Sequence, residues 1–60
     1  MTIGERIRER RKELNLTQGQ VAGRCDISYQ SVLNAEQGKS CTLETLTKIC
    51  QVLDLKIEIN

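Results

Sequence analysis

The chain has 60 residues and a formal net charge of +1, and it contains no proline, histidine, tryptophan or phenylalanine. A domain this small buries only about 60% of the surface that its unfolded chain exposes, so it needs consistent local structure or a partner chain. Without histidine or a CxxC pair, neither a metal site nor another cofactor is expected. No segment reaches the roughly 20 apolar residues of a membrane span, and the charged N-terminus argues against a signal peptide. We therefore expect a complete, cytoplasmic domain with an aliphatic core, built from helices because proline is absent and β-branched runs are few.

Charge is distributed unevenly along the chain. Residues 1–24 carry six Arg or Lys against three Glu, and residues 25–60 carry three Lys against five acidic residues. A basic N-terminal half suits a polyanionic partner such as a nucleic acid. A mixed-charge helix face that is simply solvated explains the same pattern, so charge alone leaves both interpretations open.

The first helix is predicted over residues 3–14. Thr2 and Glu5 have the spacing of a capping box, in which each side chain satisfies a free backbone N–H of the other residue. Asn15 is suited to end the helix because it adopts the left-handed conformation more readily than most residues. Three apolar residues at helical spacing are expected to face the core: Ile3, Ile7 and Leu14.

A second capping box, formed by Thr17 and Gln20, opens a helix predicted over residues 18–24. Leu16 and Val21 stand at the positions of a hydrophobic staple around this cap. The tight turn that follows is expected to contain Cys25 and Asp26.

Ser28 opens the third helix, predicted over residues 29–37, and Gly38 is suited to end it. Ile27 and Val32 occupy the staple positions around this start. The short spacing between the two starts predicts two short helices joined by a tight turn.

The fourth helix begins after Thr42, and Glu44 in its first turn is favourable to the helix dipole. A continuous apolar stripe is expected to face the core: Leu43, Leu46, Ile49, Cys50 and Leu53. The tail, residues 56–60, instead alternates polar and apolar residues, which is the pattern of a short strand.

The three cysteines are too widely spaced for a metal site. Cys25 and Cys50 are interpreted as small buried hydrophobic residues. Cys41 falls in a predicted loop and is interpreted as an exposed thiol.

Residues 17–38, TQGQVAGRCDISYQSVLNAEQG, resemble the helix-turn-helix of the phage-repressor family, the Cro/cI-like or XRE-type domains. Matches at fixed spacing make this signal more specific than a lone short motif. The matching residues include Leu16, Thr17, Gln18, Val21, Ala22, Ile27, Ser28, Val32, Glu36 and Gly38. The resemblance covers residues 2–55. It implies an all-α fold, a compact lambda-repressor-like bundle of about four to five short helices, in a DNA-binding domain spanning residues 1–55.

The tail resembles the C-terminal strand of HipB-type antitoxins, which pairs across a dimer axis. This resemblance implies that residues 56–60 are a dimerisation element, with Ile57 and Ile59 at the contact. A lone strand has unpaired backbone groups that invite a second strand. A frayed terminus, or a segment that only covers the core, remains an alternative.

The outer side of the predicted third helix carries hydrogen-bonding side chains in place of the Lys and Glu typical of a solvated helix. Gln30 and Asn34 can pair with adenine N6 and N7 in the major groove, and Tyr29 lies beside them. The resemblance implies that Gln18 touches backbone phosphate and that residues 39–40 form a further phosphate clamp. The predicted DNA-binding residues are Gln18, Ser28, Tyr29, Gln30, Ser31, Asn34, Lys39 and Ser40.

The resemblance also implies a structural ion pair between Arg11 in the first helix and Glu36 near the end of the third. At the turn where family members often have Gly, this chain has Asp26, which adopts a positive φ less readily.

These features predict sequence-specific binding of double-stranded DNA by a homodimer on a palindromic operator, with transcriptional repression as the outcome. The alternative is a protein-interaction role on the same scaffold, as an adaptor or as the antitoxin subunit of a toxin–antitoxin pair. An exposed apolar patch on the third helix would favour that alternative. An enzyme is not expected, because no nucleophile is paired with a base in the sequence.

Overall fold

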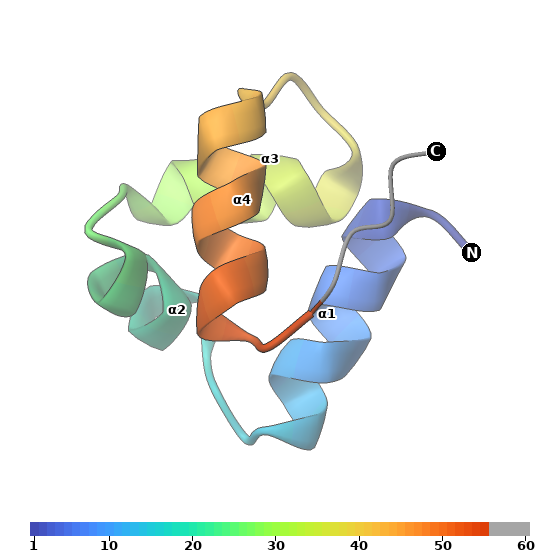
Figure 1. Ribbon diagram of the computed structural model, residues 1–60, viewed down its shortest axis with the longest axis vertical. Helices are drawn as coiled ribbons and strands as arrows, with labels where there is room; N and C mark the ends of the chain where they lie inside the picture. Colours follow the sequence, from blue (N-terminus) through green and yellow to red (C-terminus); the bar gives the residue numbers. More distant parts are fainter. Residues whose placement is uncertain (56–60) are drawn as a thin grey trace.

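The computed structural model describes residues 1–55. Within them the chain forms four helices, α1 (Ile3–Glu13), α2 (Gln18–Cys25), α3 (Tyr29–Gln37) and α4 (Leu43–Val52). In Figure 1, α4 crosses α3, and α2 and α1 lie on opposite sides of the crossing. The prediction of an all-helical bundle is confirmed over this range, which contains no strand. The predicted strand at 56–60, with its dimer contact at Ile57 and Ile59, lies outside the described residues.

The four helices are only 8 to 11 residues long. Isolated helices shorter than about 12–15 residues are marginal in water, so caps and tertiary packing must stabilise them. None of the helices in residues 1–55 has the length and apolar character needed to cross a bilayer.

Every helix begins at a hydroxyl side chain that accepts a hydrogen bond from the backbone N–H three residues later. The four caps are Thr2, Thr17, Ser28 and Thr42. Both predicted capping boxes are confirmed, because Glu5 and Gln20 also accept from the backbone N–H of their caps, at 3.0 and 2.8 Å. The backbone hydrogen bond from Thr2 lowers the pKa of Glu5. Each such cap contributes about 1 kcal/mol to the stability of its helix.

Left-handed residues end the helices where the sequence indicated. Asn15 follows α1 with φ 58°, and Gly38 caps α3 with φ 74°. Asp26 caps α2 at φ 57° and ψ 44°, so it adopts the conformation that glycine often supplies at such a turn. The prediction that Cys25 lies in this turn is wrong, because α2 continues through that residue and buries its side chain.

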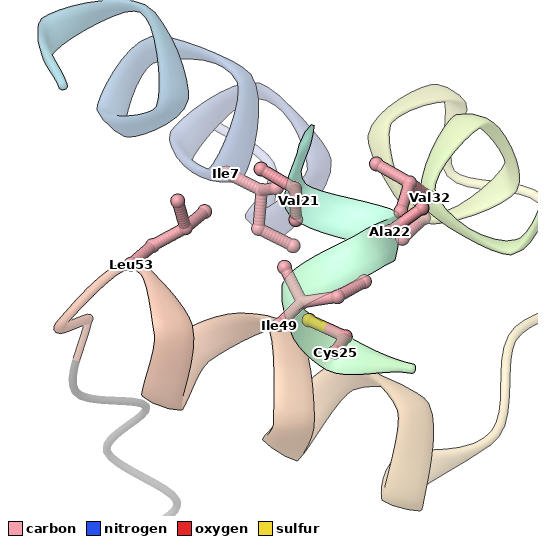
Figure 2. Close-up of a cluster of buried hydrophobic side chains, with 8 residues drawn as sticks. Ile7, Val21, Ala22, Cys25, Val32, Ile49 and Leu53 are labelled. Atoms are coloured by element: carbon pink, nitrogen blue, oxygen red, sulfur yellow. The ribbon is translucent and has the colours of Figure 1, made fainter. Parts of the chain in front are cut away.

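The core is aliphatic and draws on all four helices, as Figure 2 shows. Its buried members are Ile7, Val21, Ala22, Cys25, Val32, Ala35, Ile49 and Leu53. Small side chains sit where α2 and α3 pack against their neighbours, with Ala22 and Ala35 only 5% and 2% exposed. The aliphatic core predicted from composition is therefore confirmed for the described residues.

Three residues that the apolar periodicity assigned to the core are instead exposed. Ile3 and Leu14 retain 37% and 39% of their exposure, and Leu43 retains 65%. Each of them stands at the end of a helix, as the first helical residue or as the C-cap. Short helices that cross in a small bundle pack through their central turns, so residues at their ends extend past the contact.

Cys41 also departs from its prediction as an exposed thiol. Its side chain is half-buried against the core cluster, and its Sγ lies 3.6 Å from the backbone oxygen of Thr42. Burial raises the pKa of Cys41, as it does for Cys25 and Cys50. All three thiols therefore stay protonated at neutral pH, which fits the role of small apolar residues predicted for Cys25 and Cys50.

Gly4 allows α1 to approach α3 closely. A Cβ at this position would lie 2.5 Å from the backbone oxygen of Glu36 and 2.7 Å from that of Ala35. Both neighbours are backbone atoms of α3, so they cannot move aside as a flexible side chain would. The first turn of α1 is therefore packed directly on the backbone of α3.

Two consecutive arginines attach α1 to the rest of the bundle. Arg10 Nε donates to the backbone oxygen of Leu53 at 2.9 Å, which satisfies a carbonyl at the end of α4. Arg11 donates to Glu36 through Nε at 2.7 Å and through a terminal nitrogen at 3.1 Å. A third bond, at 2.9 Å, joins Arg11 to the backbone oxygen of Leu16. The Arg11 and Glu36 side chains are only 11% and 3% exposed, so this is a largely buried, bidentate ion pair.

Replacing Gly4 with alanine is expected to destabilise the fold by about 1–3 kcal/mol, because the added methyl group is forced against backbone atoms of α3. Gly23→Ala is the matched control, since a Cβ at Gly23 has nothing within 4 Å. That control should stabilise the protein by up to about 1 kcal/mol, through helix propensity alone. Urea unfolding followed by the helical circular dichroism signal measures both. Equal effects of the two substitutions would show that α1 and α3 do not meet at Gly4.

Arg11→Met is expected to cost about 3–5 kcal/mol in the free energy of unfolding, because it leaves the Glu36 carboxylate buried without its partner. The double variant Arg11→Met, Glu36→Leu should recover most of that loss, since it removes both charges. Thermal and urea unfolding of the single and double variants give the coupling energy. A loss below about 1 kcal/mol in the single variant, the range of exposed pairs, would contradict the burial of this pair.

Candidate nucleic-acid interface

One side of α3 packs on the core, and the other carries polar side chains. Val32 and Ala35 are buried, whereas Tyr29 is 53% exposed. The name α3 face is used below for the polar side, which consists of Tyr29, Gln30, Ser31 and Asn34. Tyr29 and Gln30 are exposed on it, and Ser31 and Asn34 are half-buried.

The first residues of α2 and α3 are joined by a hydrogen bond. The Tyr29 hydroxyl donates to Gln18 Oε1 at 2.8 Å. Gln18 Nε2 in turn donates to Glu36 Oε1 at 3.3 Å, the same oxygen that accepts from Arg11. The structure therefore connects the predicted phosphate-contacting residue Gln18 both to the α3 face and to the buried ion pair.

A second hydrogen bond on the α3 face joins two residues that lie one helical turn apart. Gln30 Nε2 donates to Asn34 Oδ1 at 2.9 Å. No hydrogen bond within residues 1–55 occupies the amide oxygen of Gln30 or the amide nitrogen of Asn34, so an acceptor and a donor are available to a ligand. An acceptor next to a donor is the pattern that recognises the edge of a base.

Ser28 and Ser31 are paired at the start of α3. The Ser28 hydroxyl accepts from the backbone N–H of Ser31 at 3.2 Å, and the two hydroxyls lie 2.9 Å apart. Ser28 therefore has a structural role as the helix cap. Ser31 also lines an open pocket of about 330 Å³ whose other walls are Ser40, Cys41, Thr42 and Thr45.

Lys39 and Ser40 lie at the opposite end of α3 from Tyr29, directly after the cap at Gly38. The backbone N–H of Lys39 donates to the Asn34 carbonyl at 2.9 Å, which secures the start of this loop. Both side chains are exposed, and the Lys39 ammonium forms no ion pair with any of residues 1–55. A cation with no internal partner is available for an anionic ligand.

A larger groove separates α1 from the start of α2. It holds about 590 Å³ and is lined by Arg8, Arg11, Leu16, Thr17, Gln18, Leu33, Glu36 and Gln37. The first turn of α2 beside it contains no acidic residue, so the positive end of the helix dipole is not neutralised there. Backbone N–H groups at such a terminus favour an anion.

The groups needed for a metal centre are not brought together in residues 1–55. No cluster of three or more His, Cys, Asp or Glu side chains occurs within that range. Some of the charged residues form ion pairs, such as Lys48 with Glu44 at 3.7 Å on α4. The polar side chains of α2 and α3 are instead joined to one another by hydrogen bonds.

The hydrogen bonds that Gln18 accepts from Tyr29 and donates to Glu36 were not anticipated from the sequence. They join residues 11 and 18 positions apart, so neither follows from a local motif. Gln18 and Tyr29 were each assigned to DNA contact separately. The structure shows that the two side chains form one unit.

Comparison with known proteins gives two matches. A family model described as helix-turn-helix matches residues 7–60. The transcriptional repressor RstR of the cryptic phage CTXphi, from Vibrio cholerae serotype O1, is 39% identical over 59 residues, which are 97% of this chain and 53% of the repressor. The chain thus spans about half the length of this curated relative. Neither match supports the predicted likeness of residues 56–60 to HipB-type antitoxins. The family model covers most of the chain, as the resemblance to phage repressors implied, and the protein belongs to the helix-turn-helix family.

Proposed function

We propose that this protein binds double-stranded DNA in a sequence-specific manner and represses transcription. The observation that carries the proposal is the α3 face, a row of exposed and half-buried hydrogen-bonding side chains on the side of α3 away from the buried Val32 and Ala35. In helix-turn-helix proteins the second helix of the motif enters the major groove with its N-terminal residues at the base edges. The similarity to a transcriptional repressor supports the regulatory role.

Phosphate contacts and base contacts come from different parts of this surface. Lys39 and Ser40 are exposed after α3, and Gln18 lies at the positive, N-terminal end of α2. These residues therefore contact the DNA backbone on either side of the α3 face. Gln30 and Asn34 present a free acceptor and a free donor to the bases. The Ser28 and Ser31 hydroxyls complete the contact at the start of α3. Phosphate contacts set the position on the duplex, and base contacts select the sequence.

A homodimer is the form that suits this surface best. The net charge is only +1, so one copy supplies little of the electrostatic attraction that dominates affinity for DNA. Two copies on a palindromic operator double the contacts, with recognition helices about 34 Å apart. The predicted pairing through Ile57 and Ile59 falls outside the described residues and stays a sequence-based prediction.

The polarity of the α3 face also favours DNA over a protein partner. Protein interfaces usually have an apolar centre enriched in aromatic residues. Tyr29 is the one aromatic residue in the sequence, and its hydroxyl is hydrogen-bonded to Gln18. The role of an antitoxin or adaptor therefore takes second place to DNA binding.

Selection of binding sites from random duplex DNA by the purified protein tests this function. It is expected to enrich a palindrome with half-sites about 10 base pairs apart, centre to centre. Gln30→Ala should relax the preference at one base position of each half-site, by about 1–3 kcal/mol, and leave the other positions unchanged. If no sequence is enriched even at low salt, the proposed function is wrong.

Lys39→Ala is expected to weaken binding to all sequences alike. The slope of log affinity against log salt should fall by about one unit per subunit, because one phosphate contact and its released counterion are lost. Lys48→Ala is the matched control, since Lys48 lies on α4 and pairs with Glu44. Titrations of a labelled duplex at several salt concentrations measure both slopes. A Lys39 variant with the slope of the control would place this lysine away from the DNA.

A further inference from the structure

The α3 face is connected to the buried ion pair by a continuous series of hydrogen bonds, which we term the relay. The relay runs from Arg11 to Glu36, then to Gln18, and ends at the Tyr29 hydroxyl. At its inner end the Glu36 side chain of the ion pair is only 3% exposed, and at its outer end Tyr29 is 53% exposed. The Glu36 carboxylate is thus connected to the Tyr29 hydroxyl on the surface proposed to bind DNA.

Each step of the relay determines the direction of the next. A carboxylate paired with a guanidinium can only accept hydrogen bonds, so Gln18 must turn its NH₂ group toward Glu36. That orientation turns Gln18 Oε1, which also can only accept, toward Tyr29. The reverse orientation would place two acceptor oxygens 3.3 Å apart, where Gln18 and Glu36 now share a hydrogen bond. The single proton of the Tyr29 hydroxyl is therefore committed to Gln18.

Resting on the proposed function, we infer that Tyr29 presents only acceptor lone pairs to the DNA and selects a base with an exocyclic amine in the major groove. Cytosine offers its N4 amine there and adenine its N6 amine. Guanine presents the acceptors N7 and O6, and thymine presents O4, so neither can satisfy an oxygen that has no proton to give. Gln18 Nε2 has a second N–H besides the one that donates to Glu36, and this donor suits a phosphate oxygen.

The Gln30–Asn34 pair lies on the same helix as Tyr29, but no charged group among residues 1–55 fixes the orientation of its amides. Gln30 donates to Asn34, and among residues 1–55 neither amide is hydrogen-bonded to a charged group. Rotating both amides by half a turn restores the same bond with donor and acceptor exchanged. The orientation of the Gln30 and Asn34 amides is therefore not fixed by a charged group, whereas that of the Tyr29 hydroxyl is fixed through Gln18 and Glu36. The two pairs serve as internal comparisons in the same binding experiment.

Tyr29→Phe tests the inference by removing the hydroxyl alone. Site selection with the wild-type protein should give C or A at one base position per half-site, and the variant should lose that preference by roughly 3- to 10-fold. The affinity for sites with G or T at that position should stay unchanged. A wild-type preference for G or T where the variant differs would overturn the inference, as would an unchanged preference in the variant.

Gln18→Met tests whether the relay sets the direction of the hydroxyl. Without Gln18 Oε1 the hydroxyl can rotate and donate to guanine or thymine, so the ratio of affinities for C or A sites over G or T sites should fall by roughly 3- to 10-fold. A uniform loss of affinity with the ratio unchanged would show that Gln18 contacts phosphate without directing Tyr29, and would overturn the inference.

Gln30→Ala is the control for both variants, because it should alter a different base position and leave the Tyr29 position unchanged. Circular dichroism melting of each variant verifies that the fold is retained. If the wild-type protein enriches a site but shows no preference for C or A at the Tyr29 position, the inference about Tyr29 is wrong and the proposed DNA binding is retained. If the wild-type protein enriches no site, both proposals are wrong.

Discussion

Arg11 and Glu36 meet through two hydrogen bonds in a place where both side chains are almost completely withdrawn from water. Withdrawing two charges from water costs several kcal/mol for each, so such a pair adds little net stability over an apolar replacement. What the pair supplies is orientation. It holds α1 against the end of α3, and it leaves an acceptor oxygen toward Gln18 at the start of α2. Three helices of the bundle thereby share one polar contact, and the polarity of the exposed surface depends on it.

The scaffold around this contact is stabilised by local and long-range terms together. Hydroxyl caps begin all four helices, and a left-handed residue follows each of them, at Asn15, Asp26, Gly38 and Asp54. An aliphatic core then joins helices that are too short to be stable alone. Rigid elements of this kind suit recognition, because binding groups held in place before contact lose less entropy on association. The α3 face is therefore presented by a frame that needs little rearrangement.

Local chemistry in the sequence was sufficient to predict the four helices and most of their ends. Capping boxes and αL residues involve neighbours within three or four positions, so they can be identified without knowledge of the fold. Packing between helices was less predictable. Apolar periodicity placed Ile3, Leu14 and Leu43 in the core, but they stand at helix ends and remain exposed. The close approach at Gly4 and the hydrogen bond from Tyr29 to Gln18 join distant parts of the chain, so no local pattern predicts them. The candidate site residues were predicted one by one from the sequence, whereas their mutual hydrogen bonds required the structure.

We propose that the α3 face, oriented by the buried ion pair, is the surface that meets DNA. Titration of the isotopically labelled protein with its selected duplex, followed by nuclear magnetic resonance, locates the contact residue by residue. We expect the largest chemical-shift changes on the side-chain amides of Gln18, Gln30 and Asn34 and on the backbone at the start of α3. Changes centred on the exposed ends of α1 and α4 at Ile3 and Leu43, with the α3 face unaffected, would contradict it.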